Sequence, residues 1–316
     1  MRYSGTRVLV TGPGGFLGTP LCEALVAEGA SVRALLRRGG GWLDRSPVGG
    51  ELERVAGDVR DPEAVLRATQ GVDLVFHLAG VTTVPQSVAD PRGTWATNVD
   101  GTLNVLEACR AHEAKLVLAS SSQVYGQARY VPIDEAHPLA PRSPYAASKL
   151  AQEALVEGWR HSYGLRATTL RTFFTYGPRQ STRSIVPTVI CQLLDGPRIR
   201  LGNLFPERDF VHVDDQVRGY LLAGLSEAAE GRCINLAGLE LVSIGSLVQR
   251  VGRLLGVEPQ VEQDPSRVRP RGSELVAVHG DSSLAAELLG WRPEIPIDEG
   301  LADCVAWYRE HRALFG

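Results

Sequence analysis

The sequence predicts an α/β fold in which helices cover both faces of a doubly wound parallel sheet, with a smaller, discontinuous C-terminal region beside it. Short apolar runs alternate with helix-period patterns through the first half of the chain, and a glycine turn follows the first run directly. The second half is less regular, with loop-rich stretches at 174–184 and 196–209 and a proline- and arginine-rich stretch at 264–272.

The elements follow one another in a βαβα order. RVLVTG (7–12) is typical of a buried strand that ends in a glycine turn, and residues 16–29 have helix-period apolar side chains up to Gly29. Further strands are predicted at 31–36, 52–58, 73–80, 114–121 and 165–173, and helices near 62–70, 93–112 and 144–163. We find no internal repeat or low-complexity linker, so a string of independent domains is not expected.

Composition excludes several classes of protein. The net charge of -3 over 316 residues gives no basic field, so we expect neither a nucleic acid nor a membrane as partner. The five cysteines are odd in number, widely spread and never in a CxxC arrangement, which argues against disulfides and zinc and favours reduced thiols in the cytoplasm. No run approaches about 18 apolar residues, and the N-terminus enters a strand directly, so no membrane span or signal peptide is expected.

A glycine motif predicts a dinucleotide site. In TGPGGFLG (11–18), Gly12, Gly15 and Gly18 follow a strand and open a helix, with Phe16 and Leu17 between the last two glycines. Glycines in this context let the backbone turn tightly, and they let a pyrophosphate approach the amides at the helix N-terminus.

The end of the second strand indicates which dinucleotide binds. An acidic residue usually stands there to bind the ribose of NAD, but SVRALLRR ends in Arg37 and Arg38. Two guanidiniums suit a 2′-phosphate, so NADP is favoured over NAD, although arginine is also this chain's habitual surface residue. Asp58 and Val59, after the third strand, are placed to meet the adenine, or Asp58 is simply a helix cap.

Tyr145 and Lys149 form the strongest catalytic signal. They lie four residues apart on one predicted helix and therefore on one face. Apart from Lys115, Lys149 is the only lysine among 33 basic residues. A nearby ammonium and an oxidised nicotinamide favour the phenolate and lower the pKa of Tyr145 toward the working range. The ammonium is also compact enough to bind the nicotinamide ribose, where the wide fork of arginine does not fit.

A serine-rich strand end completes the catalytic group. ASSSQVYG (119–126) follows an apolar strand, so its serines emerge at the carboxyl edge of the sheet, where ligands bind in doubly wound folds. A hydroxyl there can bind the substrate oxygen that Tyr145 protonates or deprotonates.

Several motifs together resemble the extended short-chain dehydrogenase/reductase family that modifies nucleotide-diphosphate sugars. They are GxxGxxG, HLAG (77–80), SSSxVYG, SPYxxSK, YGPRQ and RDFVHVDD, and they recur in family order over essentially the whole chain. The resemblance implies a Rossmann domain for NAD(P), here residues 1–173 plus about 208–236, and a nucleotide-sugar region, here about 174–207 and 237–316. It also implies that the helices at 97–112 and 145–162 pair in a homodimer.

The resemblance also assigns roles to single residues. It makes Tyr145 the acid/base, Lys149 its partner and Ser121 the substrate hydroxyl. The segment Leu78, Ala79 and Gly80 would line the cofactor. Arg208 and Arg271 would contact the sugar nucleotide's diphosphate, with Arg269 competing for the second role, and Asp209 and Asp214 would be structural.

Departures from the family pattern bear on the reaction. Gln123 stands where sugar 4,6-dehydratases have a glutamate base, and Ser122 stands where one group of them has an aspartate acid. An amide cannot remove a proton, so dehydration is disfavoured. Phe174 replaces an asparagine that contacts substrate, so the sugar or its pose is expected to be unusual.

Four functions stay open at this point. The favoured one is a sugar-nucleotide epimerase that oxidises carbon 4 and returns the hydride to the other face. A second is an NADPH-dependent 4-keto-sugar reductase. A dehydratase and a non-catalytic cofactor-binding protein follow. Regional likeness to GDP-mannose dehydratases and GDP-4-keto-6-deoxymannose reductases points to a GDP-sugar, with UDP- and dTDP-sugars open.

Overall fold

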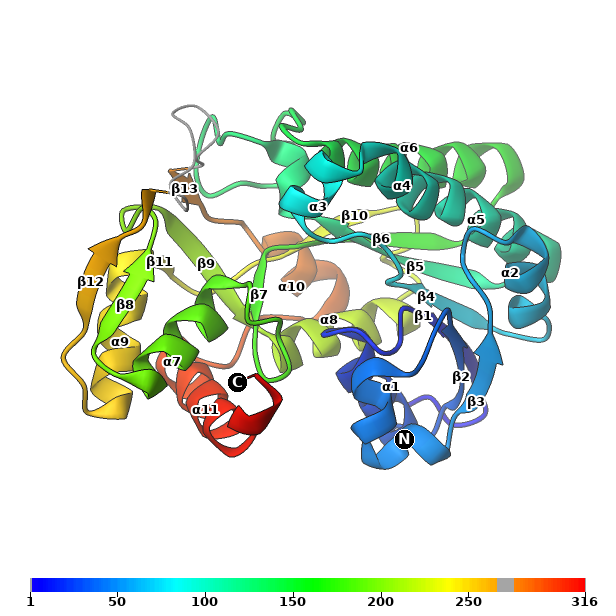
Figure 1. Cartoon of the computed structure of the whole chain (residues 1–316). Coiled ribbons are helices and arrows are strands. Elements are labelled where there is room, and N and C mark those ends of the chain that lie inside the picture. The colour runs from blue at the N-terminus through cyan, green and yellow to red at the C-terminus, as the bar shows by residue number, and fades with distance from the viewer. Residues whose placement is uncertain (1, 266–275, 316) are drawn as a thin grey trace.

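The computed structural model describes residues 2–265 and 276–315, and its larger part is a seven-stranded sheet (Figure 1). The strands lie in the spatial order β10 (Cys233–Leu236), β6 (Ala167–Thr172), β5 (Lys115–Ser121), β4 (Leu74–His77), β1 (Arg7–Thr11), β2 (Ser31–Leu36) and β3 (Glu53–Ala56). All six pairings are parallel. The predicted doubly wound sheet is therefore confirmed, because the chain winds outward from β1 in both directions.

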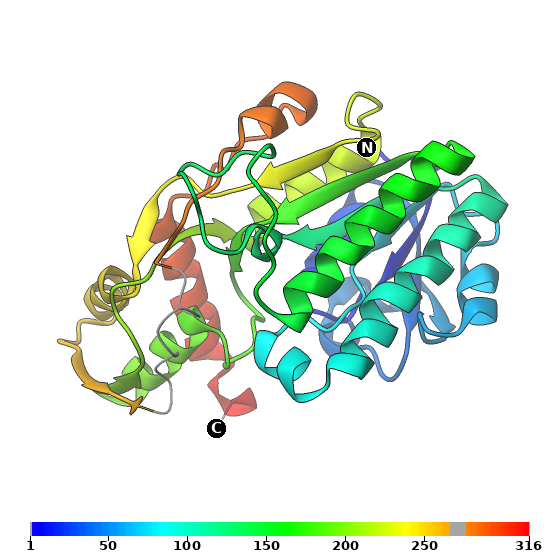
Figure 2. The same ribbon diagram turned by 90° about the horizontal axis from the view of Figure 1, so that it is seen from above.

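Helices cover both faces of this sheet (Figure 2). One face carries α2 (Pro62–Thr69), α5 (Gly101–His112) and α6 (Pro144–Tyr163), and the other carries α1 (Gly18–Ala27) and α8 (Val213–Leu225). The central strand β4 is buried at all four positions, since a sheet covered on both sides has no polar face.

The helix predicted near 93–112 differs in detail from the structure. After α3 (Val84–Ala89) the chain forms α4 (Pro91–Trp95), then a π-helical turn at Ala96–Asp100, and then α5. The side chain of Asn98 points inward from this turn and holds the backbone of Val81, accepting from its N–H at 2.7 Å and donating to its carbonyl at 3.1 Å. A π-turn inside a helix often marks a functional position.

The second part of the molecule has its own sheet and apolar core. Strand β9 (Glu207–His212) pairs with β7 (Phe174–Tyr176), β11 (Leu241–Ser243) and β13 (Ala277–Val278), and β8 (Arg198–Leu201) pairs with β12 (Gln260–Gln263). Helices α7 (Ile185–Asp195), α9 (Ile244–Leu255) and α11 (Ile297–Glu310) pack against one another in the second core.

Two loop predictions need correction here. The stretch 174–184 contains β7, and 196–209 contains β8 and the start of β9. These strands are only three to six residues long, and turns separate them, so their side-chain alternation is too brief to be recognised.

The chain crosses between the two parts more than once. Strand β9 belongs to the small sheet, whereas α8 and β10, which follow it, belong to the large one, and α10 (Ser283–Leu289) returns to pack on α8 and β10. Aromatic contacts add a further link, because Trp42, just after β2, packs on Trp307 of α11 and on Phe315. No helix in the described ranges is long and apolar enough to span a bilayer.

Candidate active site

The glycine turn after β1 has the geometry that a dinucleotide needs. Gly12 has a φ of +71°, and a Cβ there would lie 2.9 Å from the amide nitrogen of Ala79. A Cβ on Gly18 would lie 2.1 Å from the carbonyl oxygen of Gly12, so the turn closes only with glycine at both positions. Gly15 is exposed, and the half-buried Phe16 and Leu17 lead into α1 without a side-chain cap or an acidic first turn. The turn therefore fits a pyrophosphate at the N-terminus of α1.

Two arginines lie beside this turn, at the end of β2. Arg37 and Arg38 are both exposed. The charge of Arg37 also reaches the half-buried Asp58 after β3, whose pKa is held below its usual range mainly by a hydrogen bond from Arg60 and partly by Arg37. The structure thus brings Arg37 and Asp58 to one edge of the sheet. Val59 is buried, and its carbonyl accepts from the side chain of Asn104 at 2.9 Å.

The segment after β4 is tied to the glycine turn. Thr11 Oγ1 accepts from the backbone N–H of Ala79 at 3.1 Å and lies 2.7 Å from Nδ1 of His77. Leu78 donates its backbone N–H to the carbonyl of Thr11, and Gly80 sits close against the Asn98 amide. Residues 78–80 therefore lie against the glycine turn at Gly12.

The start of α6 fixes the place of Tyr145 and Lys149. Ser143 caps the helix by accepting from the backbone N–H of Ala146 at 3.1 Å, and Pro144 occupies the first helical position. Tyr145 and Lys149 therefore lie in consecutive turns, and both are buried, with exposures of 8% and 4%. Lys149 Nζ donates to the carbonyl of Ala119 on β5 at 2.8 Å, which anchors the ammonium at the sheet edge.

Burial dominates the electrostatics of this pair. It raises the pKa of Tyr145, and a hydrogen bond with Ser121 opposes that rise. Burial also lowers the pKa of Lys149 to about 8, against the attraction of Glu153. The expected lowering of the Tyr145 pKa is thus not found in the protein without its cofactor, because burial outweighs the neighbouring groups.

The serine-rich end of β5 lies beside Tyr145. Ser121 is the last residue of β5, and its hydrogen bond with Tyr145 joins it to the catalytic pair. Ser121 Oγ also accepts from the backbone N–H of Gln123 at 3.3 Å. Ser122 is buried and Gln123 is partly exposed in the short 3-10 helix η4 (Ser122–Tyr125). The structure therefore brings Ser121, Tyr145 and Lys149 together, and the backbone N–H of Gln123 contacts Ser121.

Two of the proposed substrate residues, Phe174 and Arg208, lie in the small sheet. The guanidinium of Arg208 lies 5.6 Å from the ring centroid of Phe174, and that ring packs edge-on against Phe210 at 5.7 Å. Phe174 of β7 and Arg208 of β9 are thus neighbours and form a cation–π contact. The sequence did not predict this contact. Arg271 and Arg269 lie outside the described residues.

The two aspartates near Arg208 differ. Asp209 is fully buried and accepts from the backbone N–H groups of Gly280 and Gly238, at 2.7 and 3.4 Å, which is a structural role. Asp214 is exposed in the first turn of α8. Within the described ranges, no group of three or more potential ligands is arranged to hold a metal ion.

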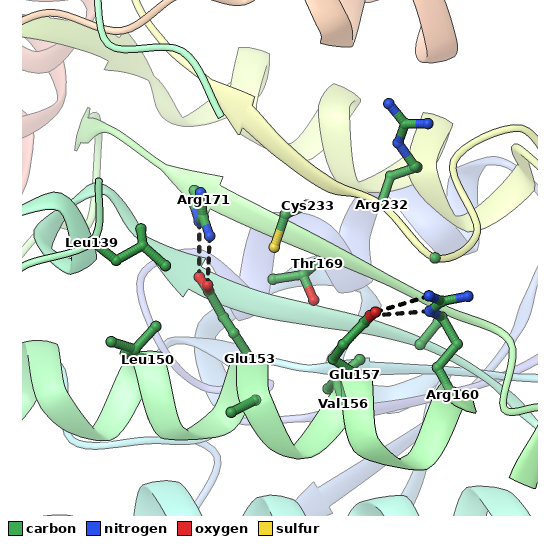
Figure 3. A pocket seen from close by; sticks show the side chains of 13 residues that line it. Leu139, Leu150, Glu153, Val156, Glu157, Arg160, Thr169, Arg171, Arg232 and Cys233 are labelled. Carbon is green, nitrogen blue, oxygen red and sulfur yellow. Dashed lines mark hydrogen bonds and ion pairs between the residues drawn. The ribbon is translucent and has the colours of Figure 1, made fainter. Parts of the chain in front are cut away.

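Sequence reasoning missed two polar residues that support the site. Asn98 holds the backbone of Val81. Its side chain also donates to Oγ of Ser148, the residue before Lys149, at 2.8 Å. Glu153 lies buried one turn after Lys149 and binds Arg171 beside a cavity of about 390 Å³ (Figure 3). The signal for Glu153 was available, because it repeats the four-residue spacing of Tyr145 and Lys149.

Comparison with known proteins finds relatives over nearly the whole chain. A family model described as GDP-mannose 4,6 dehydratase matches residues 9–304. A dTDP-glucose 4,6-dehydratase of Mycolicibacterium smegmatis is 33% identical over 97% of this chain and 94% of its own length. A UDP-glucose 4-epimerase of the same organism is 32% identical over 96% and 98%. A GDP-6-deoxy-D-mannose reductase of Pseudomonas aeruginosa is 32% identical over 93% and 94%.

Solved structures are similar over nearly the whole chain. The UDP-glucose 4-epimerase of Thermotoga maritima, determined with UDP-glucose, has a TM-score of 0.90 at 28% identity and covers 97% of this chain and 100% of its own. A dTDP-glucose 4,6-dehydratase of Streptomyces venezuelae, determined with NAD bound, has a TM-score of 0.87 at 30% identity, with 98% of each chain covered. These relatives catalyse three different reactions.

Proposed function

The chain belongs to the extended short-chain dehydrogenase/reductase family of nucleotide-sugar epimerases, dehydratases and reductases, and on this premise we propose that it is an NAD(P)-dependent nucleotide-sugar 4-epimerase. The observation that carries the proposal is the group Ser121, Tyr145 and Lys149, together with a glutamine and not a carboxylate at position 123, whose backbone N–H donates to Ser121. That group supports hydride exchange at a carbinol carbon and supplies no carboxylate at the position where dehydratases have their base.

The proposed chemistry assigns one task to each side chain. Ser121 binds the oxygen on carbon 4, and Tyr145 takes the hydroxyl proton as the carbon–hydrogen bond breaks, leaving a ketone. A nicotinamide cofactor held at the glycine turn and by Lys149 would supply the acceptor, and then the donor, of the hydride. Lys149 holds the charge that favours the phenolate of Tyr145, and its anchor on Ala119 keeps it at the sheet edge. The keto sugar then rotates in the site so that the hydride returns to its other face. Tyr145 gives the proton back to the oxygen on carbon 4, and the other epimer forms.

The amide of Gln123 separates this proposal from a dehydratase. Dehydration requires a base to remove a proton from the sugar carbon next to the ketone, and an amide has no basic lone pair for that task. Gln123 does have a donor and an acceptor suited to a sugar hydroxyl. It therefore supports binding of the sugar rather than elimination of water.

A 4-keto-sugar reductase is the second candidate, and the arginines after β2 favour it. Arg37 and Arg38 are exposed where a 2′-phosphate would lie, which supports our proposal that NADP is preferred over NAD. A reductase would use Ser121, Tyr145 and Lys149 in the same way, but Tyr145 would then donate its proton in the only chemical step.

We propose a nucleotide-diphosphate sugar of the GDP or UDP type as substrate. Arg208 supports it, because a guanidinium held against an aromatic ring is a suitable partner for a diphosphate. Pairing of two copies through α5 and α6 is proposed as well, since these helices lie side by side on one face and Trp95 and Tyr163 near them are exposed. Light scattering of the purified protein would test the dimer.

The test of function is the small molecule that denatured, freshly purified protein releases. We expect about one NAD(P)+ per chain, because a redox-neutral epimerase keeps its cofactor through turnover. The mass of that molecule distinguishes NAD from NADP. Empty protein that binds NADPH weakly and reduces a 4-keto sugar would support the reductase instead. Failure to bind either dinucleotide would refute the assignment of the glycine turn.

A further inference from the structure

Glu153 is a buried carboxylate one turn after Lys149. Its side chain is only 7% exposed, and it is held from two neighbouring strands. Ser120 Oγ, at the end of β5, donates a hydrogen bond to Oε1. Arg171 of β6 donates from Nε to Oε1 at 3.0 Å and from Nη2 to Oε2 at 2.7 Å. This two-pronged pairing fixes the position of the carboxylate.

Arg171 is itself held in place by contacts on the side away from Glu153. Its Nη1 donates to the hydroxyl of Tyr125 at 2.8 Å, and that hydroxyl donates to the side-chain oxygen of Asn235 on β10 at 2.7 Å. Figure 3 shows Glu153 and Arg171 facing each other across the space between α6 and the sheet. The chain of contacts spans β5, β6, η4 and β10, so the carboxylate has little freedom to move away from α6.

Stability alone is a weak reason for such a pair. Two charges lose their hydration on burial, and a buried ion pair often stabilises a fold no better than apolar side chains of the same volume. The next carboxylate along α6, Glu157, pairs with Arg160 in the ordinary exposed manner. The pair of Glu153 and Arg171 as a whole is therefore one that apolar side chains could replace at little cost in stability.

The lysine beside Glu153 does need a negative charge. The amine of Lys149 and the carboxylate of Glu153 are held by adjacent residues of β5, because Lys149 Nζ donates to the carbonyl of Ala119 at 2.8 Å and Ser120 Oγ donates to Glu153. Burial lowers the pKa of Lys149 to about 8, and Glu153 opposes this lowering. Without the carboxylate, the lysine would be neutral over more of the pH range in which an enzyme works. A neutral lysine cannot stabilise the phenolate of Tyr145.

We propose that Glu153 is a positioning residue of the active site: held by Ser120 and Arg171, its carboxylate keeps the amine of Lys149 charged beside Tyr145. It touches neither sugar nor cofactor and acts through Lys149. The catalytic part of this inference rests on the proposed function, whereas the effect of Glu153 on Lys149 does not.

Other charged groups around this part of α6 do not replace Glu153. His77 of β4 is fully buried, and its pKa is lowered to about 3, so it is neutral when the enzyme works. Tyr125 of η4 carries a proton, because burial raises its pKa. The remaining charged residues on the elements packed against α6 either are exposed or lie away from Lys149, near the C-terminal end of α6 or at the start of β5. They are Arg92, Asp100, Glu107, Arg110, His112 and Lys115.

The two-lysine composition of the chain makes a direct test possible. Lysine labelled with ¹³C at Cε gives two side-chain signals, from Lys115 and Lys149, and a Lys115→Arg variant assigns them. We expect Glu153→Gln to lower the pKa of Lys149 by about one unit or more, because a buried unit charge one turn away is lost and Arg171 is left positive. Glu157→Gln, one turn further along α6, should leave that titration unchanged.

Catalysis gives the second readout. In Glu153→Gln, the alkaline limb of the kcat profile should move to lower pH together with the Lys149 titration, and in Glu157→Gln it should stay in place. Equal Lys149 titrations in the two variants would overturn the inference. If wild-type protein shows no sugar epimerisation, the proposed function fails while the NMR titration still decides the role of Glu153.

A second variant covers the case in which Glu153→Gln does not fold. Glu153→Gln with Arg171→Met removes both charges, so no unpaired guanidinium is buried. The pKa of Lys149 should again fall, by less than in the single variant, because the distant positive charge is removed too. A Lys149 titration at its wild-type pH in this double variant would overturn the inference.

Discussion

Replacing Lys149 by methionine removes the charge next to Tyr145 and keeps the length of the side chain. Side chains four residues apart on a helix have Cβ atoms about 5–6 Å apart. Two unit charges roughly 6 Å apart attract by roughly 3 kcal/mol at an effective dielectric constant of about 20, which equals about two pH units. In the cofactor-bound enzyme, Lys149→Met should therefore raise the pKa of Tyr145 by about two units and lower kcat near pH 7 about 100-fold.

The assay is the rate of sugar epimerisation or of hydride transfer at 340 nm, measured from pH 5 to 10. The pKa of Tyr145 sets the acid limb of the profile, so activity should be lost below a pH that is about two units higher in Lys149→Met. The matched control is Lys115→Met at the only other lysine. Lys115 lies at the opposite end of β5 and pairs with Glu230 at 3.2 Å and the carbonyl of Ser226 at 2.7 Å.

The control should separate stability from catalysis. Lys115→Met breaks a largely buried ion pair, so we expect a lower unfolding temperature and an unchanged pH profile. If kcat of Lys149→Met near pH 7 were within fivefold of wild type and the acid limb of its pH–rate profile were unmoved, the role given to Lys149 would be refuted.

Three other substitutions test separate parts of the site. Gly18→Ala puts a Cβ 2.1 Å from the Gly12 carbonyl, so we expect at least a tenfold loss of dinucleotide affinity by calorimetry, whereas Gly158→Ala, in open space on α6, should bind normally. Replacing Arg37 and Arg38 by alanine should weaken NADPH about 10- to 100-fold and leave NADH unchanged, and equal losses for both would argue against a 2′-phosphate site. Arg208→Met should raise KM for the nucleotide sugar about tenfold or more at unchanged dinucleotide affinity, and an unaltered KM would place the diphosphate elsewhere.

The large sheet could be predicted from sequence because its signals are local and strong. Strand β4 is apolar at every position but His77, and α6 has Ser143 and Pro144 at its start and Gly164 in a left-handed conformation at its end. The glycine turn was predictable for the same reason, since its spacing and its place between a strand and a helix are both visible in the sequence.

The small sheet and the supporting contacts were not predictable in the same way. Strands β7 and β13 have three and two residues, and they form because β9 lies beside them, which is a tertiary effect. The contact of Phe174 with Arg208 and the bridge from Glu153 to Arg171 both join residues far apart in the chain, so only the fold reveals them.

The pKa of Tyr145 shows the limit of reasoning from neighbours alone. The i, i+4 spacing predicts that Lys149 and Tyr145 share one face of α6, but no pattern in the sequence indicates how deeply the pair is buried. Burial raises the pKa of the tyrosine and lowers that of the lysine, and both effects work against the ion pair that the chemistry needs. Additional charges, from Glu153 and from the bound cofactor, therefore have to restore it.

The most direct test of the proposed function is to incubate the purified protein, without added cofactor, with UDP- and GDP-sugars carrying deuterium at carbon 4. We predict a 4-epimer that keeps the deuterium, because the same hydride leaves and returns, and no product from a Tyr145→Phe variant. A 4-keto-6-deoxy sugar as product, or turnover only of a 4-keto sugar with added NADPH, would contradict the epimerase.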